Sequence, residues 1–430
     1  MRSWCIPVFM IIVSSLFGAD GAAPAAPQAA GWKQKQFLIT FWCPPPATDE
    51  ALAAVAAEHY NLTWVPLEGL DVAHKHGLRA MLTNELLNPA TLDDAAKRAQ
   101  LDALIARVKD HPAMEAYFIT DEPSAGAFAA LGKLVAYLKE RDPAHFAYIN
   151  LFPTYANETQ LGVTVQEAAR AKAALPANLN GVGPDDRVVL PYREHLKRFI
   201  EVVKPELVSY DHYHFFKDHD GTQYFLNLAL IRQAALEAGK PFVNIIQASL
   251  VEKVWRLTNP VEMRFLVYTT LAYGGRGISY FTYWGPLSYG GLYQDGKASP
   301  LAKDVAALNA EIEKLGPALL ALDSLGVYHT APLPYGGEAF PADAPVRVTG
   351  GGEFVLGLFG RAGRPTAFMI VNRSYRADAE ADVRVALPGF ALKELDRTTG
   401  AWIEGPALGA ERALKVKLRA GDGRLFRLGD

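Results

Sequence analysis

Cysteine is scarce in this sequence: among 430 residues there are two, Cys5 and Cys43. Residues 1–23 have the layout of a secretory signal peptide, with Arg2, an apolar run and then small residues. Removal of that segment would leave Cys43 as a single thiol, which excludes an intramolecular disulfide in the mature chain. We therefore expect a secreted or periplasmic protein that depends on a hydrophobic core, since 50% of its residues are hydrophobic.

Excess positive charge and long apolar runs are also missing. The formal net charge is −3, which gives no electrostatic support for a nucleic-acid partner. Beyond the N-terminal segment, no run approaches the roughly 20 apolar residues of a membrane-spanning helix, so stable membrane insertion is not expected.

Several motifs that mark nucleophile or cofactor sites are absent as well. There is no GxSxG nucleophile elbow, and no glycine-rich phosphate loop follows an early strand. Residues 211–220 are rich in His and Asp, but this run has neither HExxH spacing nor cysteine pairs. We therefore predict no metal site and no other cofactor.

From residue 36 to residue 325, short apolar segments alternate with amphipathic ones. Apolar residues have helical spacing in segments 101–108 and 131–138. Helices between parallel strands form crossover connections, and eight such units close most naturally into a (β/α)8 TIM barrel. A doubly wound sheet is the alternative, because segment 68–78 is too short for a full helix. We predict strands at residues 37–43, 63–67, 79–83, 116–120, 146–151, 207–213, 242–247 and 277–283, and helices at 49–60, 92–109, 126–140, 194–203, 224–238, 261–273 and 300–322.

The pattern changes near residue 325. Residues 326–430 alternate apolar and polar residues in short runs separated by Gly, Pro, Asn and Asp, which is typical of an antiparallel β-sandwich. No cluster of catalytic residues lies in it. We expect segment 153–190, an insertion after the fifth strand, to shape the substrate site. The predicted organisation is a signal peptide at 1–23, a linker at 24–35, a TIM-barrel domain at 36–325 and a β-sandwich domain at 326–430.

The stretch AYFITDEPS, residues 116–124, joins an apolar run to two adjacent carboxylates and a proline. An apolar run between a helix and Pro123 is typical of a buried parallel strand, and Asp121 and Glu122 lie where that strand would emerge. Barrels keep their chemistry at this end. Burial there would raise the pKa of a carboxyl group, so Glu122 is our candidate general acid. The alternative is that Asp121 caps the following helix and Glu122 lies on its first turn.

Other predicted strands also end in polar and aromatic side chains. Asp211 is a further candidate catalytic residue, because strand alternation places it near the strand end on one face with Ser209 and Tyr213. The alternative interpretation is that Asp211 has no catalytic role and is a buried side chain hydrogen-bonded to a neighbouring His or Tyr. Aromatic rings beside hydrogen-bonding groups suit an oligosaccharide or polysaccharide, although core packing is the alternative for any single ring. The candidate substrate-binding residues are Trp42, Glu68, Tyr148, Asn150, Tyr210, His212, Tyr213, Gln247, Tyr283 and Trp284.

Four motifs together resemble those of glycoside hydrolase barrels: AYFITDEPS, INLFPTYA, LVSYDHYHF and LAYGGRGISYFTYWGP. The resemblance covers roughly residues 36–325 and is nearest to clan A, which includes the family 42 beta-galactosidases. There the fourth strand ends in a general acid/base Glu, commonly within Asn-Glu-Pro. Glu122 matches that position, whereas Asp121 replaces the usual Asn. The resemblance implies a secreted glycoside hydrolase with Glu122 as proton donor.

The seventh strand departs from the pattern of that clan. The clan places its nucleophilic Glu there, but this sequence reads FVNIIQAS and has Gln247 at that position. One interpretation is that another carboxylate takes the role, and the candidates are Glu252, Asp211, Glu68 and Glu85. A second interpretation is a non-catalytic carbohydrate-binding barrel that lacks a nucleophile.

A third interpretation rests on the adjacent acids of the fourth strand. They are similar to the consecutive Asp-Glu of the substrate-assisted hexosaminidases in families 20 and 123. That resemblance implies that Glu122 protonates the leaving oxygen while Asp121 orients the acetamido group of the substrate as the nucleophile. Tyr210, Tyr213 or Asn150 would then hold the acetamido group.

Overall fold

The computed structural model describes residues 31–171, 178–183, 186–285, 289–387 and 391–429. The predicted signal peptide and most of the predicted linker lie outside these residues. Within them, no helix is both long and apolar enough to cross a membrane.

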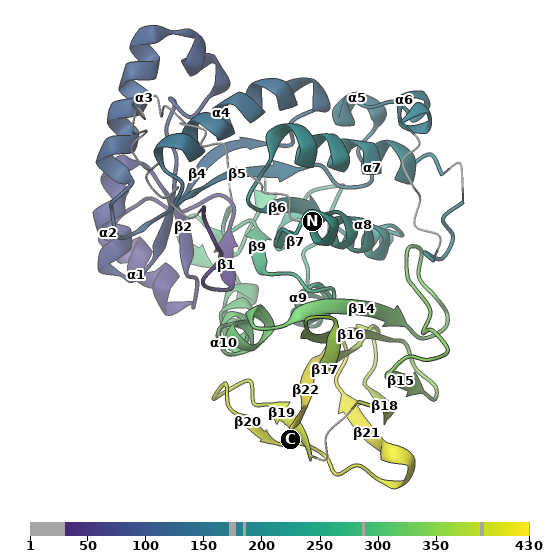
Figure 1. The fold of residues 1–430 in the computed structure, drawn as a ribbon. Helices are drawn as coiled ribbons and strands as arrows, with labels where there is room; N and C mark the ends of the chain where they lie inside the picture. The colour runs from purple at the N-terminus through teal and green to yellow at the C-terminus, as the bar shows by residue number, and fades with distance from the viewer. Residues whose placement is uncertain (1–30, 172–177, 184–185, 286–288, 388–390, 430) are drawn as a thin grey trace, which may run out of the picture.

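Eight parallel strands form a single sheet in the order β1-β9-β7-β6-β5-β4-β3-β2 (Figure 1). All eight predicted strands are present, and their register is parallel throughout. The strands are β1 (Leu38–Phe41), β2 (Leu62–Val65), β3 (Arg79–Leu82), β4 (Met114–Asp121), β5 (Phe146–Leu151), β6 (Val208–His212), β7 (Phe242–Gln247) and β9 (Gly277–Phe281).

Asn61 closes the sheet between its two outer strands, β1 and β2. Its backbone N–H donates to the Ile39 carbonyl at 3.1 Å. Its side-chain Oδ1 accepts from the Ile39 N–H at 2.9 Å, and its Nδ2 donates to the Phe37 carbonyl at 2.8 Å. The ring is therefore a (β/α)8 barrel, and the doubly wound alternative is wrong.

Helices cover the outside of the barrel. Segment 68–78 holds only a 3₁₀ turn and the short α2 (Leu70–Lys75), which is enough to connect β2 to β3. Buried side chains of α4 (Phe128–Arg141), such as Leu131 and Leu138, face the strands with the predicted helical spacing. The other helices that cover the barrel are α1 (Asp49–Ala57), α3 (Ala95–Val108), α7 (Val189–Arg198), α8 (Tyr224–Glu237), α9 (Pro260–Ala272) and α10 (Pro300–Leu320).

The interior of the barrel is a packed apolar layer toward the N-terminal ends of the strands. Inward side chains such as Leu38, Met81 and Val243 form one buried cluster. Trp32 covers this end, with its ring 4.5 Å from that of Phe146. The opposite, C-terminal rim carries the longer loops. These hold α5 (Glu158–Leu161) and α6 (Val165–Arg170) after β5, and the two-residue strands β8 (Leu250–Val251), β10 (Trp284–Gly285), β11 (Tyr289–Gly290), β12 (Tyr293–Gln294) and β13 (Lys297–Ala298).

Two antiparallel sheets follow the barrel and pack on each other, and the larger of them packs against α9 through β16 and β17 (Figure 1). A Cβ atom at Gly357 would lie 2.2 Å from the Ala272 carbonyl oxygen, so glycine allows β16 to approach the end of α9 closely. The predicted boundary at residue 325 falls within β14. The larger sheet has the order β14-β16-β17-β22-β19-β20, and the smaller one has the order β15-β18-β21. Their strands are β14 (Asp323–His329), β15 (Val346–Thr349), β16 (Phe354–Arg361), β17 (Arg364–Asn372), β18 (Ala379–Val385), β19 (Ala391–Leu395), β20 (Trp402–Glu404), β21 (Ala413–Leu418) and β22 (Gly423–Gly429).

Candidate active site

A β-bulge near the end of β4 determines which way its carboxylates point. Phe118 pairs with Tyr148 of β5, but after an extra residue Asp121 pairs with Asn150. Because alternate residues of a strand face opposite sides, the extra residue brings Asp121 to the inward side on which Phe118 also lies. Glu122 follows with φ of 43°, and its backbone N–H donates to the Asn150 carbonyl at 2.9 Å. A positive φ is uncommon for Glu and marks a locally constrained turn.

Neither acid caps the following helix. The short 3₁₀ helix after β4 spans Ala125–Ala127 with Ser124 as its N-cap residue, and α4 begins at Phe128 with Ala127 as its N-cap residue. Neither helix receives a side-chain hydrogen bond at its cap. The capping alternative for Asp121 is therefore wrong.

A pocket of about 270 Å³ opens at the C-terminal ends of the barrel strands. Six of the predicted site residues line it together: Trp42, Asp121, Glu122, Asn150, Asp211 and Tyr213. The remaining lining residues are Phe152, Pro153, Tyr155, Ala156, Gln160, Ile245, Trp255 and Phe281.

The three carboxyl groups of the pocket form one cluster. The Nδ2 of Asn150 donates to Asp121 Oδ1 at 3.0 Å and to Asp211 Oδ1 at 2.8 Å. The side chains of Glu122 and Asp211 are hydrogen-bonded to each other. Two carboxyl groups in direct contact share a proton, because both cannot ionise at that separation without strong repulsion.

Burial raises the pKa of every member of this cluster, and the charge of a neighbouring acid raises the pKa of Glu122 and Asp211 further. Burial, followed by the charge of Asp121, raises the pKa of Glu122 to about 7. Burial, followed by the charge of Glu122, raises the pKa of Asp211. Burial also raises the pKa of Asp121, against the opposing hydrogen bond from Asn150. The cluster therefore keeps a transferable proton near neutral pH, as a general acid requires.

The wall that faces the carboxylates is apolar and aromatic. The ring of Tyr213 lies 4.4 Å from that of Trp255 and 5.2 Å from that of Phe281, with Ile245 of β7 beside them. Among the described lining residues, the carboxylates come only from β4 and β6. A sugar in this pocket would meet rings on one side and hydrogen-bonding acids on the other.

Gln247 binds the loops of the barrel rim and does not line the pocket. It is fully buried, its Oε1 accepts from the Phe215 N–H at 2.9 Å, and its Nε2 donates to the carbonyls of Phe215 and Arg256, each at 2.9 Å. Its amide thus joins the loop after β6 to the loop after β7. The structure gives Gln247 this positioning role in place of the predicted contact with substrate.

Two other predicted substrate-binding residues face away from the pocket because of strand alternation. Tyr210 and His212 flank Asp211 on β6 and point outward toward the helices. His212 Nδ1 lies 2.9 Å from Asn227 Oδ1 of α8. Both side chains belong to the packing between the sheet and the helices.

The remaining predicted contacts also lie outside the lining of the pocket. Tyr148 lies in the barrel interior, with its hydroxyl 2.9 Å from Ser209 Oγ. Tyr283 is stacked on Phe41 at 4.5 Å, and Trp284 is part-buried in β10. Glu68 is exposed on the 3₁₀ turn before α2, and the alternative nucleophiles Glu85 and Glu252 are exposed as well.

Several pocket residues were not in the predicted set. Phe281 could have been found from the sequence, because it continues the inward alternation of Ser279 on β9. Tyr155 and Gln160 come from the insertion at 153–190, which we expected to shape the site; Tyr155 is one of the aromatic residues that follow the fifth predicted strand. Trp255 lies in the loop after β7, and nothing in the local sequence indicates that this loop folds back over the pocket.

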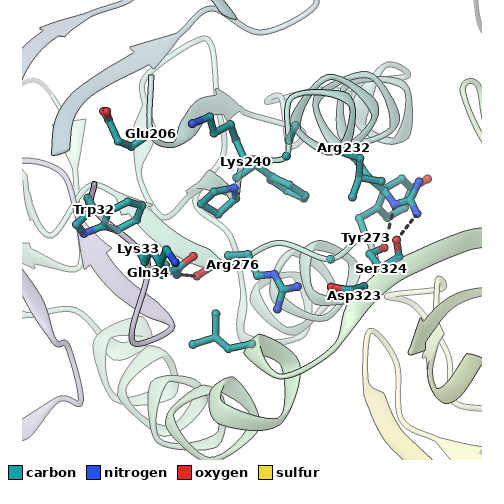
Figure 2. Close-up of a pocket in the computed structure, with 17 residues that line it drawn as sticks. Trp32, Lys33, Gln34, Glu206, Arg232, Lys240, Tyr273, Arg276, Asp323 and Ser324 are labelled. Atoms are coloured by element: carbon teal, nitrogen blue, oxygen red, sulfur yellow. Dashed lines mark hydrogen bonds between the residues drawn. The ribbon is translucent and has the colours of Figure 1, made fainter. Parts of the chain in front are cut away.

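A larger hollow of about 440 Å³ lies at the opposite, N-terminal end of the barrel (Figure 2). Two of its arginines hold neighbouring segments of the fold together. Arg232 Nε donates to Ser324 Oγ of β14 at 3.0 Å, and Arg276 donates to the carbonyls of Leu319 and Leu322 at the end of α10. This hollow is the seam between the barrel and the first strand of the sandwich, and that end of a barrel usually serves stability.

No protein-family model and no curated protein matches this sequence. Solved structures do match its fold. A GH42 beta-galactosidase from G. stearothermophilus, solved as a catalytic mutant, superposes with a TM-score of 0.50 at 11% identity, over 91% of this chain and 98% of that chain. A family 39 glycoside hydrolase from Bacteroides cellulosilyticus WH2 gives a TM-score of 0.48 at 11% identity, over 91% and 81% of the two chains.

The match to the GH42 structure extends through most of both chains. The predicted resemblance to glycoside hydrolase barrels is therefore confirmed at the level of the fold. One fold can carry many different activities, so the function of this protein depends on the residues that line its pocket.

Proposed function

We propose that this protein is a glycoside hydrolase in which Glu122 donates a proton to the departing glycosidic oxygen. The observation that carries this proposal is the position of Glu122. It lines a pocket at the C-terminal rim of a barrel, and burial and Asp121 raise its pKa to about 7. Cleavage of a glycosidic bond needs such an acid, because the sugar alkoxide is a poor leaving group until it is protonated.

The substrate is an oligosaccharide or polysaccharide. Trp42, Tyr213, Trp255 and Phe281 offer ring surfaces for the C–H faces of a sugar. Asp121 and the Glu122–Asp211 pair offer acceptors for its hydroxyl groups. A pocket with rings on one wall and acids on the other fixes both the face and the rotation of a sugar ring.

The second chemical step does not follow the usual two-carboxylate scheme. A retaining enzyme holds its two carboxyl groups about 5 to 5.5 Å apart, and an inverting enzyme about 6.5 to 9.5 Å apart, with the anomeric carbon between them. Glu122 and Asp211 touch each other, so no sugar fits between them. Of the described lining residues on the facing wall, Ile245, Trp255 and Phe281 carry no carboxylate.

This arrangement favours a second, more specific candidate: a substrate-assisted beta-N-acetylhexosaminidase. The acetamido oxygen of the substrate would attack its own anomeric carbon while Glu122 gives its proton to the leaving oxygen. Asp121 would accept a hydrogen bond from the acetamido N–H, and Tyr213 would contact the acetamido group. The ionised Glu122 would then take a proton from the water that opens the cyclic intermediate, which restores the starting state.

The test is hydrolysis of a panel of aryl glycosides, with and without a 2-acetamido group, by the wild-type protein and by Glu122→Gln. For glycosides with weakly acidic leaving groups, we expect Glu122→Gln to lose roughly 10²- to 10⁴-fold in kcat, the range of general acid catalysis. Glu68→Gln is the matched control, because Glu68 is exposed and outside the pocket. Saccharide binding in calorimetry without turnover of any glycan would instead identify a non-catalytic carbohydrate-binding barrel.

We also propose that the protein is exported and that residues 1–23 are removed. The layout of Arg2, an apolar run and small residues supports this proposal. N-terminal sequencing of the protein from its own cells tests it. A mature chain that begins near residue 24 is expected, and a chain that begins at Met1 would contradict it.

A further inference from the structure

A chain of buried hydrogen bonds runs from the barrel interior to the carboxylates. The Tyr148 hydroxyl lies 2.9 Å from Ser209 Oγ, and Ser209 Oγ donates to Asn150 Oδ1 at 3.1 Å. Asn150 Nδ2 then donates to Asp121 and Asp211. Asn150 is 1% exposed, Ser209 0% and Tyr148 3%.

The direction of every bond in this chain is determined by its ends. An ionised carboxylate can only accept, so the amide of Asn150 turns its N–H groups toward the acids and its Oδ1 toward Ser209. The Ser209 hydroxyl must donate to that Oδ1, and its oxygen is left to accept from Tyr148. Bonds aligned in this way polarise one another and strengthen the final N–H donors.

We infer that Asn150 is a positioning residue that holds the three acids of the pocket in their working geometry, and that Ser209 and Tyr148 support it. The inference rests on the proposed function, because it explains how the proposed acid and its neighbours are held in place. The N–H of Asn150 stabilises the ionised form of Asp211. The hydrogen bond between Asp211 and Glu122 lowers the pKa of Glu122 and raises that of Asp211, so Asn150 also places the hydrogen-bond partner of the acid by holding Asp211.

Asn150 also fixes the backbone of the acid. Its carbonyl accepts the Glu122 N–H at 2.9 Å, at the positive-φ position that turns the Glu122 side chain out of β4. Asn150 thus contacts all three acids. Both of its Nδ2 hydrogens are used, so it acts on substrate through the acids and not as a direct donor.

Other titratable groups face the cluster from the neighbouring elements. Burial raises the pKa of each of them, so they stay uncharged through the range in which Glu122 and Asp211 titrate. They are Cys43 after β1, Tyr148 of β5, Tyr155 in the loop after β5, Tyr192 of α7 and Tyr213 after β6.

The experiment compares Asn150→Ala, Ser209→Ala and Tyr148→Phe with the wild-type protein. Two readouts are used: titration of the side-chain carboxyl carbons by ¹³C NMR, and the pH profiles of kcat and KM. For Asn150→Ala we expect the pKa of Asp211 to rise by roughly one unit, the order of one hydrogen bond to a charged group. We expect kcat to fall about tenfold with KM little changed, because the acids lose the side chain that holds them in place.

Ser209→Ala and Tyr148→Phe should shift the pKa of Asp211 and kcat in the same direction as Asn150→Ala, but by less. The effect of Ser209→Ala should be larger than that of Tyr148→Phe. Tyr148→Phe preserves volume, so it tests the chain even where Asn150→Ala does not fold. Asn88→Ala, an exposed helix cap, is the control and should shift nothing. Unchanged carboxyl titration in folded variants, or a rise in KM with kcat unchanged, would overturn the inference. A shifted titration in a protein that hydrolyses no glycoside would uphold the role of Asn150 and refute the proposed function.

Discussion

The side chains of Glu122 and Asp211 are hydrogen-bonded to each other, although β4 and β6, which supply them, are separated in the sheet by β5. Asn150 of the intervening strand donates to Asp211 and accepts the backbone N–H of Glu122. The pair binds one proton that neither acid would keep alone at neutral pH. The pH behaviour of the protein should follow from that proton.

Activity should fall above neutral pH. Burial and Asp121 raise the pKa of Glu122 to about 7, and the acid works only while it is protonated. We expect kcat/KM for a glycoside to decline as pH rises through about 7. A profile that stays flat to pH 9 would contradict the assignment of Glu122 as the acid.

Stability should also decline as pH rises. The pKa of Glu122 is higher in the folded protein than the ordinary value of 4.5. Its contribution to stability is therefore fully present below about pH 4.5 and is lost as pH rises through about 7. Urea unfolding at pH 5 and pH 8 measures the change, and Glu122→Gln should reduce the difference between the two. An equal difference in wild type and variant would show that Glu122 is not its source.

Gln247→Glu should destabilise the protein and should not create a nucleophile. The Nε2 of Gln247 donates to two backbone carbonyls, and a carboxylate would turn acceptors toward acceptors in a fully buried site. We expect a loss of roughly 3 kcal/mol in the free energy of unfolding, the order of an unpaired buried charge. Gln100→Glu on the exposed face of α3 is the control. Wild-type stability with increased turnover would instead place position 247 in the active site.

The sandwich should influence the pocket through Asp220. Arg256, next to Trp255, donates to Asp220 Oδ1 at 2.7 Å, and Tyr375 of the sandwich donates to Asp220 Oδ2 at 2.5 Å. Asp220→Asn weakens both bonds and so loosens one of the contacts that hold the loop carrying Trp255. We expect KM to rise several-fold with a smaller change in kcat, since the acid is untouched. Asp218→Asn, exposed in the same loop, should behave as wild type, and an equal effect of both changes would argue against this link.

The barrel could be predicted from the sequence because its strands are buried on both faces. Such strands are short apolar runs, and the helices between them have helical spacing, as in residues 131–138 of α4. The acids could be predicted because Asp121 and Glu122 directly follow one of these runs. Asp211 could be predicted from alternation along β6, and the same alternation should have placed Tyr210 and His212 outside the pocket.

Other parts of the site depend on contacts that no local pattern encodes. The bulge after Phe118 turns Asp121 inward, against the alternation that the sequence suggests. Gln247 occupies the strand position at which a nucleophile was expected. Its amide, however, is hydrogen-bonded to the backbone of Phe215, which is distant in the sequence, and of Arg256, which lies in the loop after β7. Trp255 reaches the pocket only because its loop folds back onto Tyr213.

The central claim is that Glu122 protonates the leaving oxygen, and the dependence on leaving group tests it most directly. The measurement is kcat/KM of wild type and Glu122→Gln for aryl glycosides whose phenols range from strongly to weakly acidic. An acidic phenol departs without protonation, so the variant should cleave those glycosides nearly as well as wild type and lose increasing activity as the phenol becomes less acidic. A loss of the same size for every leaving group, or no loss for any of them, would contradict the claim.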